Sequence, residues 1–181
     1  IRAVSEYQTK LVEYNLRHRS GKDAIKAGMG VHFGKVLLGA VGFKERLSIS
    51  VVSDAVNLAS RLDGLTKRIG VDALCTDDVI AHLKSNADYR LVAELRVVGR
   101  QSLTKVYELY GHLNDSIKTS YRSNREELTY LIKMWSTKDV DGCFSLVSSL
   151  LEKNPNDPVI KYYYEEISSS KSIDKDGKAA A

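Results

Sequence analysis

The sequence predicts an α+β fold, with helices packed on a sheet that is mixed or mostly antiparallel, followed by a helical segment. Three observations indicate this fold. Short β-prone runs alternate with helical patterns as far as about Gly111. Glycine-containing reversals at Gly34-Lys35 and Gly99-Arg100 predict two hairpins. From Tyr121 onward the pattern is helical, and no further strand is predicted.

The first part of the chain has the clearest local signals. Apolar residues at helical spacing predict a helix over Ile1–His18. Ser53-Asp54 offers two good N-cap residues and predicts the start of a second helix, which ends near Gly70. Gly39 and Gly42, inside the first hairpin, predict that something else approaches the backbone closely there. Strands are expected at 27–33, 36–41, 47–52, 72–76, 91–98 and 103–109, with a short helix at 77–84.

The C-terminal part is predicted to be a helical extension. Helices are expected at 125–135, 140–153 and 158–167, separated by turn-forming residues. The character of the sequence changes around 112–120, which places a boundary near Gly111. We therefore expect an α+β domain over 1–111, a helical extension over 112–173, and a flexible tail or a remnant of cloning over 174–181.

Composition excludes several classes of protein. Hydrophobic residues make up 43% and charged residues 28%, so the chain is able to bury a core. The net charge of +4 is scattered, which argues against a nucleic-acid partner. Cys75 and Cys143 have no metal-ligand spacing and are expected to be reduced core thiols. They favour a cytoplasmic location, either for a whole protein or for the cytosolic part of a larger or membrane-anchored one. No apolar run approaches the ~20 residues that cross a bilayer.

Two polar residues stand out on the helix after Ser53. Asn57 and Arg61 are four residues apart, so a helix presents both on one face, one turn apart. The planar and permanently charged guanidinium of Arg61 is suited to developing charge on a phosphoryl group. The amide of Asn57 both donates and accepts, which suits a ribose. On spacing alone, a solvated helix face is the more common explanation of such a pair.

A longer pattern surrounds this pair. The string Val56–Leu62 closely resembles the V-N-x-A-S-R segment of class III adenylate and guanylate cyclases. The preceding Gly30–Gly42 resembles the G-I-H-x-G-x-V-x-x-G-x-x-G of that family, and Lys105–Leu109 resembles its closing strand. The resemblance extends to about residue 111 of the 181 residues. It implies that 1–111 is the C-terminal portion of a ferredoxin-like cyclase sandwich.

The resemblance also implies a function. Family members convert a purine nucleotide to a cyclic nucleotide and pyrophosphate, for intracellular signalling, at an active site between two protomers. Asn57 matches the position that orients the ribose, and Arg61 matches the one that stabilises the transition state. Ser50 matches the base-selecting position, where family adenylate cyclases usually have Asp or Thr and guanylate cyclases often Cys. We expect ATP and a homodimer, and GTP stays open.

The sequence departs from the family pattern at several positions. Ser53 replaces a common glycine, and Val98 replaces the first Lys of a Lys-Gly-Lys, so Arg100 is the remaining candidate for a phosphate contact. The resemblance implies Mg²⁺ or Mn²⁺, bound by aspartates upstream of Ile1, because no acidic residue here matches those positions. We therefore expect this stretch alone to be inactive. The alternatives are a catalytically inactive regulatory or dimerisation module, or a guanylate cyclase.

The helical extension has a resemblance of its own. The segment from Trp135 to Pro158 is similar to a tetratricopeptide-like hairpin that often follows bacterial cyclase domains. A free-standing array of such repeats needs at least three units, and one is present here. The extension is expected either to be a cap or dimerisation element, or to have no separate role.

Overall fold

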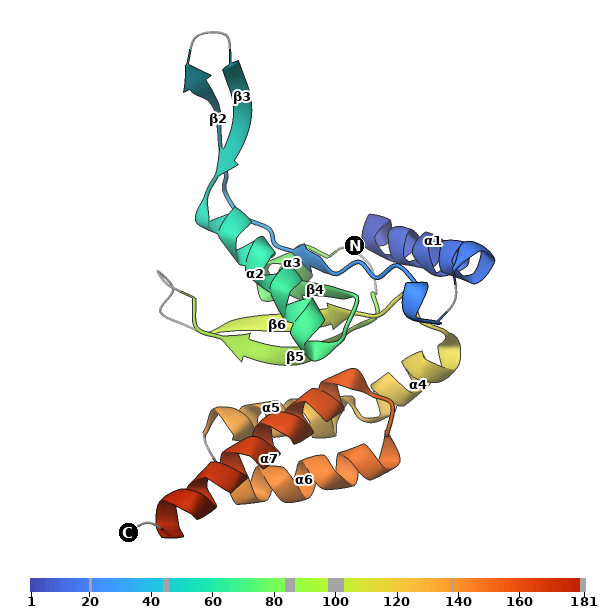
Figure 1. Ribbon diagram of the computed structural model, residues 1–181, viewed down its shortest axis with the longest axis vertical. Coiled ribbons are helices and arrows are strands. Elements are labelled where there is room, and N and C mark those ends of the chain that lie inside the picture. The colour runs from blue at the N-terminus through green and yellow to red at the C-terminus, as the bar shows by residue number, and fades with distance from the viewer. Residues whose placement is uncertain (20, 44–45, 84–86, 98–102, 138, 180–181) are drawn as a thin grey trace.

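The computed structural model describes residues 1–19, 21–43, 46–83, 87–97, 103–137 and 139–179, and its arrangement is shown in Figure 1. The predicted α+β class is confirmed, including the helical C-terminal extension. The elements in chain order are α1 (Arg2–His18), a 3₁₀ turn η1 (Gly21–Asp23), β1 (Met29–Val31), β2 (Leu37–Phe43), β3 (Arg46–Val52), α2 (Asp54–Ile69), β4 (Ala73–Thr76), α3 (Asp77–Ala81), β5 (Tyr89–Leu95), β6 (Thr104–Leu109), α4 (Asp115–Ser123), α5 (Arg125–Ser136), α6 (Val140–Lys153) and α7 (Pro158–Ala179).

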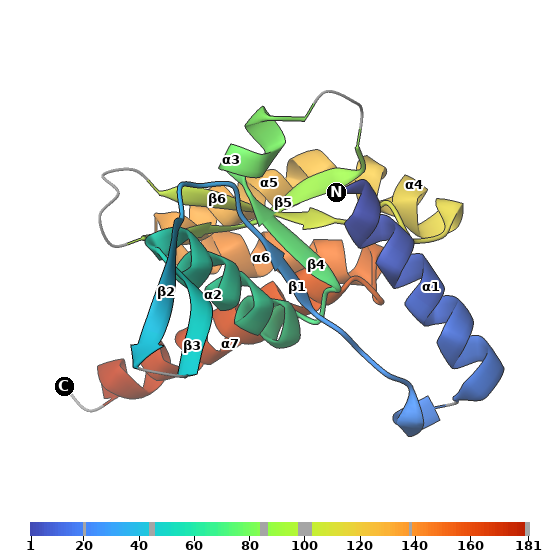
Figure 2. The same ribbon diagram turned by 90° about the horizontal axis from the view of Figure 1, so that it is seen from above.

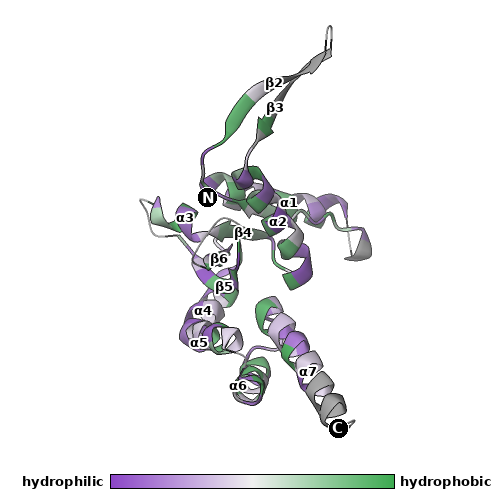
Figure 3. Ribbon diagram, turned by 90° about the vertical axis from the view of Figure 1, so that its left-hand side faces the viewer, coloured by the Kyte–Doolittle hydropathy of each residue, from purple (hydrophilic) through white to green (hydrophobic). Residues whose placement is uncertain are grey.

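The central sheet has the strand order β1-β4-β6-β5. β1 pairs parallel with β4, while β4 and β5 both pair antiparallel with β6. Successive side chains of β4 point to opposite faces, as a strand requires. Leu74 packs with α2 and the C-terminal helices, whereas Ala73 and Cys75 pack with α1 and α3. Helices therefore cover both faces, and Figures 2 and 3 show α2 and α3 on opposite sides of the strands.

One predicted hairpin is wrong. The sequence pattern placed a reversal at Gly34-Lys35, but β1 does not pair with β2. Instead β2 pairs with β3, with Leu38 opposite Val51, and this hairpin projects from the body of the molecule (Figure 1). The parallel partner of β1 is β4, which the chain reaches only after the hairpin and α2. A parallel pair needs such a long crossover, and local turn signals do not reveal it.

The C-terminal helices share a core with the sheet. One cluster of buried residues contains Val92 of β5, Leu131 of α5 and Ile160 of α7. Helix α4 was not predicted, and α7 runs to Ala179, so the described part of the expected 174–181 tail is helical. The extension is therefore packed directly against the α+β domain. No helix among the described residues has the length and apolarity needed to span a membrane.

A buried ionic cluster joins the two parts. Arg90 of β5 donates to Glu108 of β6 through Nε, at 2.7 Å, and to Asp157 through Nη2, at 2.9 Å. Asp157 precedes α7 and also accepts from the amide of Val159 at 3.0 Å, so its carboxylate caps that helix. The ring of Tyr121, from α4, lies 3.3 Å from the guanidinium carbon of Arg90. The start of α7 is thus tied to the sheet through buried charges.

Candidate functional site

Helix α2 carries the residues that resemble the cyclase motif. It begins as predicted at Ser53, whose Oγ accepts from the amides of Ala55 and Val56 at 3.1 and 3.4 Å. It ends as predicted at Gly70, which is in the left-handed conformation with φ 86°. Leu58, Leu62, Thr66 and Ile69 form its buried stripe and orient the helix on the sheet. The opposite face of the helix is directed to solvent.

Asn57 and Arg61 are both exposed on α2. They lie one turn apart, as their spacing predicts. Neither side chain hydrogen-bonds to another residue in the part of the chain that the structure describes. Buried polar groups need internal partners, but these two are free to meet a ligand.

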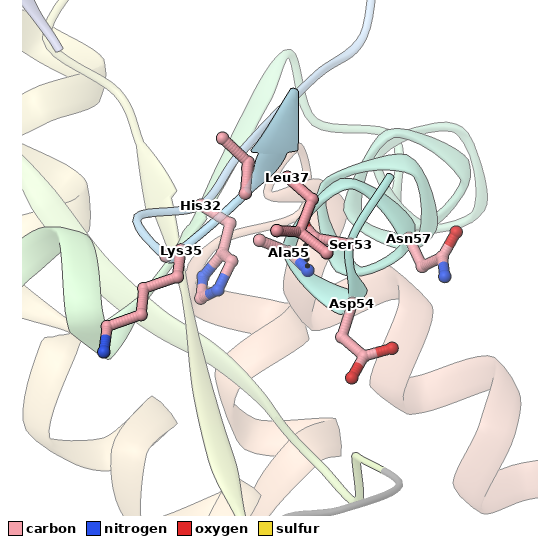
Figure 4. A pocket seen from close by; sticks show the side chains of 9 residues that line it. His32, Lys35, Leu37, Ser53, Asp54, Ala55 and Asn57 are labelled. Atoms are coloured by element: carbon pink, nitrogen blue, oxygen red, sulfur yellow. Dashed lines mark hydrogen bonds between the residues drawn. The ribbon is translucent and has the colours of Figure 1, made fainter. Parts of the chain in front are cut away.

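A hollow of about 810 Å³ lies at the start of α2 (Figure 4). Asn57 lines it, together with His32 and Lys35 from the segment that links β1 to β2. Arg61 is not among its lining residues. In Figure 4, Lys35 and Asn57 lie on opposite sides of His32, and Asp54 extends outward between them. The hollow is therefore lined both by Asn57 and by a cation that the sequence analysis had assigned only to a turn.

His32 is the most enclosed side chain in this region. It is 4% exposed, and its Nδ1 lies 2.8 Å from Oγ1 of Thr76 and 3.8 Å from a carboxylate oxygen of Asp78. Nδ1 donates or accepts depending on the tautomer. His32 follows β1 and Thr76 ends β4, so this contact links the ends of the two strands beside the hollow.

A glycine positions α2 on the sheet. A Cβ at Gly30 would overlap the carbonyl oxygen of Ala59 and crowd the amide of Asp63, so only glycine lets the backbone of α2 lie this close to β1. Nothing in the described part of this chain lies within 4 Å of a Cβ built at Gly39, so the close approach predicted there does not come from these residues. In the sequence, Gly30 could have been recognised as a position of close packing from its place in the Gly-Val-His string, two residues before His32.

The remaining predicted site residues are only partly placed. Ser50 lies on β3 with its backbone opposite Gly39, seven residues before Asn57, and its side chain lies outside the described part of the structure. Arg100 and Val98 lie outside the described residues altogether. The structure therefore brings Asn57 and Arg61 onto one helix face and does not test the expected contacts of Ser50 and Arg100.

The described residues do not fit a metal site. They contain no group of three or more His, Cys, Asp or Glu side chains that could hold an ion. Hard divalent cations such as Mg²⁺ bind through clustered carboxylate and carbonyl oxygens. What the described residues offer is a set of groups for sugar and phosphate, namely the amide of Asn57, the guanidinium of Arg61 on the same helix and the ammonium of Lys35 in the hollow.

The sequence is similar to known cyclases from bacteria. It is 37% identical over 94 residues to an adenylate cyclase of Anabaena cylindrica, covering 50% of this chain and 19% of that protein. It is 33% identical over 105 residues to adenylate cyclase 1 of Rhizobium meliloti (strain 1021), covering 58% of this chain and 16% of that protein. The chain thus spans less than a fifth of the length of either of these relatives.

The fold has a counterpart among solved structures. A bacterial light-regulated adenylyl cyclase superposes with a TM-score of 0.52 at 20% identity, over 68% of this chain and 36% of that one. This likeness concerns the fold alone. The family model for the adenylate and guanylate cyclase catalytic domain matches residues 2–111, from the start of α1 to the residue Gly111 that follows β6. The chain therefore belongs to the adenylate and guanylate cyclase catalytic domain family.

Proposed function

We propose that this chain is part of a nucleotide cyclase that converts ATP to cyclic AMP and pyrophosphate at a dimer interface. The observation that carries the proposal is the exposed pair Asn57 and Arg61 on α2, inside the segment that the family model matches. The names of the bacterial relatives, both adenylate cyclases, favour ATP over GTP. The cyclic nucleotide would serve as an intracellular signal.

The proposed reaction forms one bond and breaks one bond at the α-phosphorus. The ribose 3′-oxygen bonds to the α-phosphorus, the bond to the β-phosphate oxygen breaks, pyrophosphate leaves, and the 3′-hydroxyl proton passes to water. Asn57 would hold the ribose in the orientation for attack, because its amide both donates and accepts. Arg61 would donate to the equatorial oxygens as negative charge builds up on them.

Cyclases of this family use divalent metal ions, and in this protein we expect Mg²⁺ or Mn²⁺. The described residues of this chain do not offer a metal site. We assign them the sugar and phosphate contacts only, and Arg100 is the proposed further phosphate contact. Ser50, which precedes α2, is the proposed contact to the base, where a hydroxyl can both donate and accept.

An exposed apolar surface supports a homodimer through the cyclase domain. Leu38 of β2 and Val51, its cross-strand partner on β3, share one face of the projecting hairpin and are 70% and 42% exposed. Contiguous apolar surface of this kind marks interaction sites in soluble proteins. Leu38→Glu should shift sedimentation from dimer to monomer. Tyr130→Ser removes an exposed ring on α5 and should leave the oligomeric state unchanged.

The activity is tested with Mn-ATP and Mn-GTP on the protein that contains this chain. Arg61→Ala should lower cyclic-nucleotide production about 10²–10³-fold, as removal of one preorganised donor does. Lys67→Ala is the matched control, since Lys67 is another exposed cation on α2, and it should retain activity. Equal activity of Arg61→Ala and Lys67→Ala would exclude the proposed role of Arg61.

A catalytically inactive regulatory module is the second candidate. The observation that favours it is Val98, which stands where the family has a phosphate-binding Lys. Such a module would bind nucleotide without turnover. Isothermal titration with ATP, in parallel with the activity assay, separates the two, because only the module binds ATP while producing no cyclic AMP and no cyclic GMP.

A further inference from the structure

Helix α7 contacts the last turns of α2 both through an exposed ion pair and through buried apolar side chains. Arg68, in the last turn of α2, donates through Nη2 to Oε1 of Glu166 at 2.7 Å. The same guanidinium lies 5.4 Å from the centre of the Tyr162 ring. Tyr162 and Glu166 are one turn apart on α7, so both contact the Arg68 side chain of α2 from one face of that helix.

The contact of Arg68 with Glu166 and Tyr162 lies on the same side of α2 as Arg61. Seven residues separate Arg61 from Arg68, which is close to two helical turns, or about 10 Å along the axis. Residues at this spacing share a face. Between them lies Gly64, where nothing is found within 4 Å of a Cβ position. Arg61 and Arg68 therefore lie on one exposed face of the same helix.

Helix α7 itself has little freedom to move. Its start is capped by Asp157, whose carboxylate is bound by the buried Arg90. Further along, Oη of Tyr163 donates to the carbonyl oxygen of Val92 on β5 at 2.9 Å. Buried hydrogen bonds of this kind fix the register of one element on another. The residue next to Tyr162 is thus fastened to the sheet.

The cores of α2 and α7 are also continuous. Ile69 of α2 and Tyr163 and Ile167 of α7 belong to one cluster of buried residues. Packed interiors transmit displacement because they contain few voids. The sheet, α7 and the end of α2 accordingly share one packed core, while the start of α2 leads into the projecting hairpin.

We propose that α7 is a positioning element for the cyclase site: Glu166 and Tyr162 hold Arg68, and through α2 they set the position of Arg61. This inference rests on the proposed catalytic role of Arg61. It gives the helical extension a role in the reaction, whereas the sequence left open a cap or dimerisation element, or no separate role. Glu166 and Tyr162 do not contact substrate, and they act only through α2.

The first test measures α2 without reference to catalysis. In Glu166→Lys, like charges face each other across the contact, and hydrogen exchange of the α2 amides from Leu58 to Leu65 should become about fivefold faster. The matched control is Asp63→Asn, which breaks the exposed 3.5 Å pair between Asp63 and Lys67 within α2 and leaves α7 untouched. Unchanged exchange in Glu166→Lys, or equal acceleration in Asp63→Asn, overturns the inference.

The second test separates positioning from folding. The charge swap of Arg68→Glu with Glu166→Arg restores the pair and should restore both the exchange rates and the activity. In Glu166→Lys, kcat for Mn-ATP should fall about fivefold with KM nearly unchanged, because the transition-state contact is displaced while substrate binding persists. A fall that the swap does not restore would overturn the inference. If exchange responds as expected and even the unsubstituted protein makes no cyclic nucleotide, the proposed function fails and the mechanical coupling stands.

Discussion

Arg90 and Asp157 are 67 residues apart in the sequence, yet Nη2 of Arg90 donates to Oδ1 of Asp157 at 2.9 Å in the interior, where both side chains are almost fully buried. Glu108 binds the other side of the same guanidinium. Burial raises the pKa of Glu108, and the attraction of Arg90 opposes this rise. One cation therefore serves two buried carboxyl groups, one on the sheet and one at the start of α7.

Removing the positive charge of Arg90 should lower the free energy of unfolding. Arg90→Met leaves two carboxyl groups buried without a counter-charge, and the free energy of unfolding should fall by about 3–5 kcal/mol. Arg90→Lys should also destabilise the fold. The single ammonium of lysine cannot replace a planar guanidinium that binds Glu108 through Nε and Asp157 through its two terminal nitrogens. Urea denaturation measures both changes. Arg122→Met breaks the 2.7 Å pair with Asp88, in which Arg122 is 60% exposed, and should cost less than about 1 kcal/mol. Similar urea midpoints for Arg90→Met and Arg122→Met would contradict this account.

Two glycines near α2 should respond in opposite directions to the same substitution. Gly30→Ala places a methyl group against the backbone of α2 and should lower the free energy of unfolding by at least 1–3 kcal/mol, at roughly the cost of overpacking. Gly64→Ala adds a methyl group in open space inside an exposed helix and should stabilise by about 0.5–1 kcal/mol. Thermal and urea unfolding of the two variants give the comparison. If both variants lose stability, the close approach at Gly30 is not the cause.

Stability should fall at alkaline pH. Burial raises the pKa of the Cys75 thiol to about 12, and burial also raises the pKa of Tyr121 and of Tyr163. In the unfolded chain a cysteine loses its proton near pH 8.5. Above that pH the unfolded state binds fewer protons than the folded state, so stability declines as pH rises towards 12.

The contribution of Cys75 can be isolated by substitution. Cys75→Ala should be less stable at neutral pH, but its stability should fall less steeply above pH 9 than that of the unsubstituted protein, by up to about 1.4 kcal/mol per pH unit. Urea midpoints at pH 8, 9.5 and 10.5 measure the slope. Parallel slopes in the two proteins would show that Cys75 does not titrate in this range.

Local patterns predicted the elements of this protein well. The spacing of Asn57 and Arg61, the Ser53 cap and the terminating Gly70 are all properties of one short segment, and the structure has α2 where they place it. Their roles in catalysis stay a proposal, because exposure alone does not identify a ligand. The resemblance of the extension to a tetratricopeptide hairpin also stays a prediction.

Long-range partners were beyond those patterns. Nothing near β1 indicates that its parallel partner is β4, on the far side of a hairpin and a helix. Asp157 was read only as a turn residue between two helices, and its buried partner Arg90 sits in an unremarkable strand sequence. Helix α4 is short and polar, and it was missed, although Asn114 caps it by accepting from the amide of Ile117. Each of these features depends on which distant surfaces meet.

A truncation after Gly111 tests whether the α+β part folds without the helical extension. The extension covers Val92 and Val106, which are both fully buried, and it supplies the Asp157 that binds Arg90. Removing the extension exposes an apolar face of the sheet and leaves Arg90 and Glu108 without Asp157. Residues 1–111 should therefore form soluble aggregates or remain unfolded. Size-exclusion chromatography and circular dichroism of this fragment give the answer.

The fragment that ends at Lys153 is the matched control for that truncation. It retains α4 to α6 and lacks both Asp157 and α7, so it should be destabilised less than the fragment that ends at Gly111. A 1–111 fragment that is monomeric, with a cooperative thermal transition, would mean that the boundary expected near Gly111 separates independent domains. The coupling from α7 to α2 would then be dispensable for folding, and its effect would be confined to the geometry of Arg61.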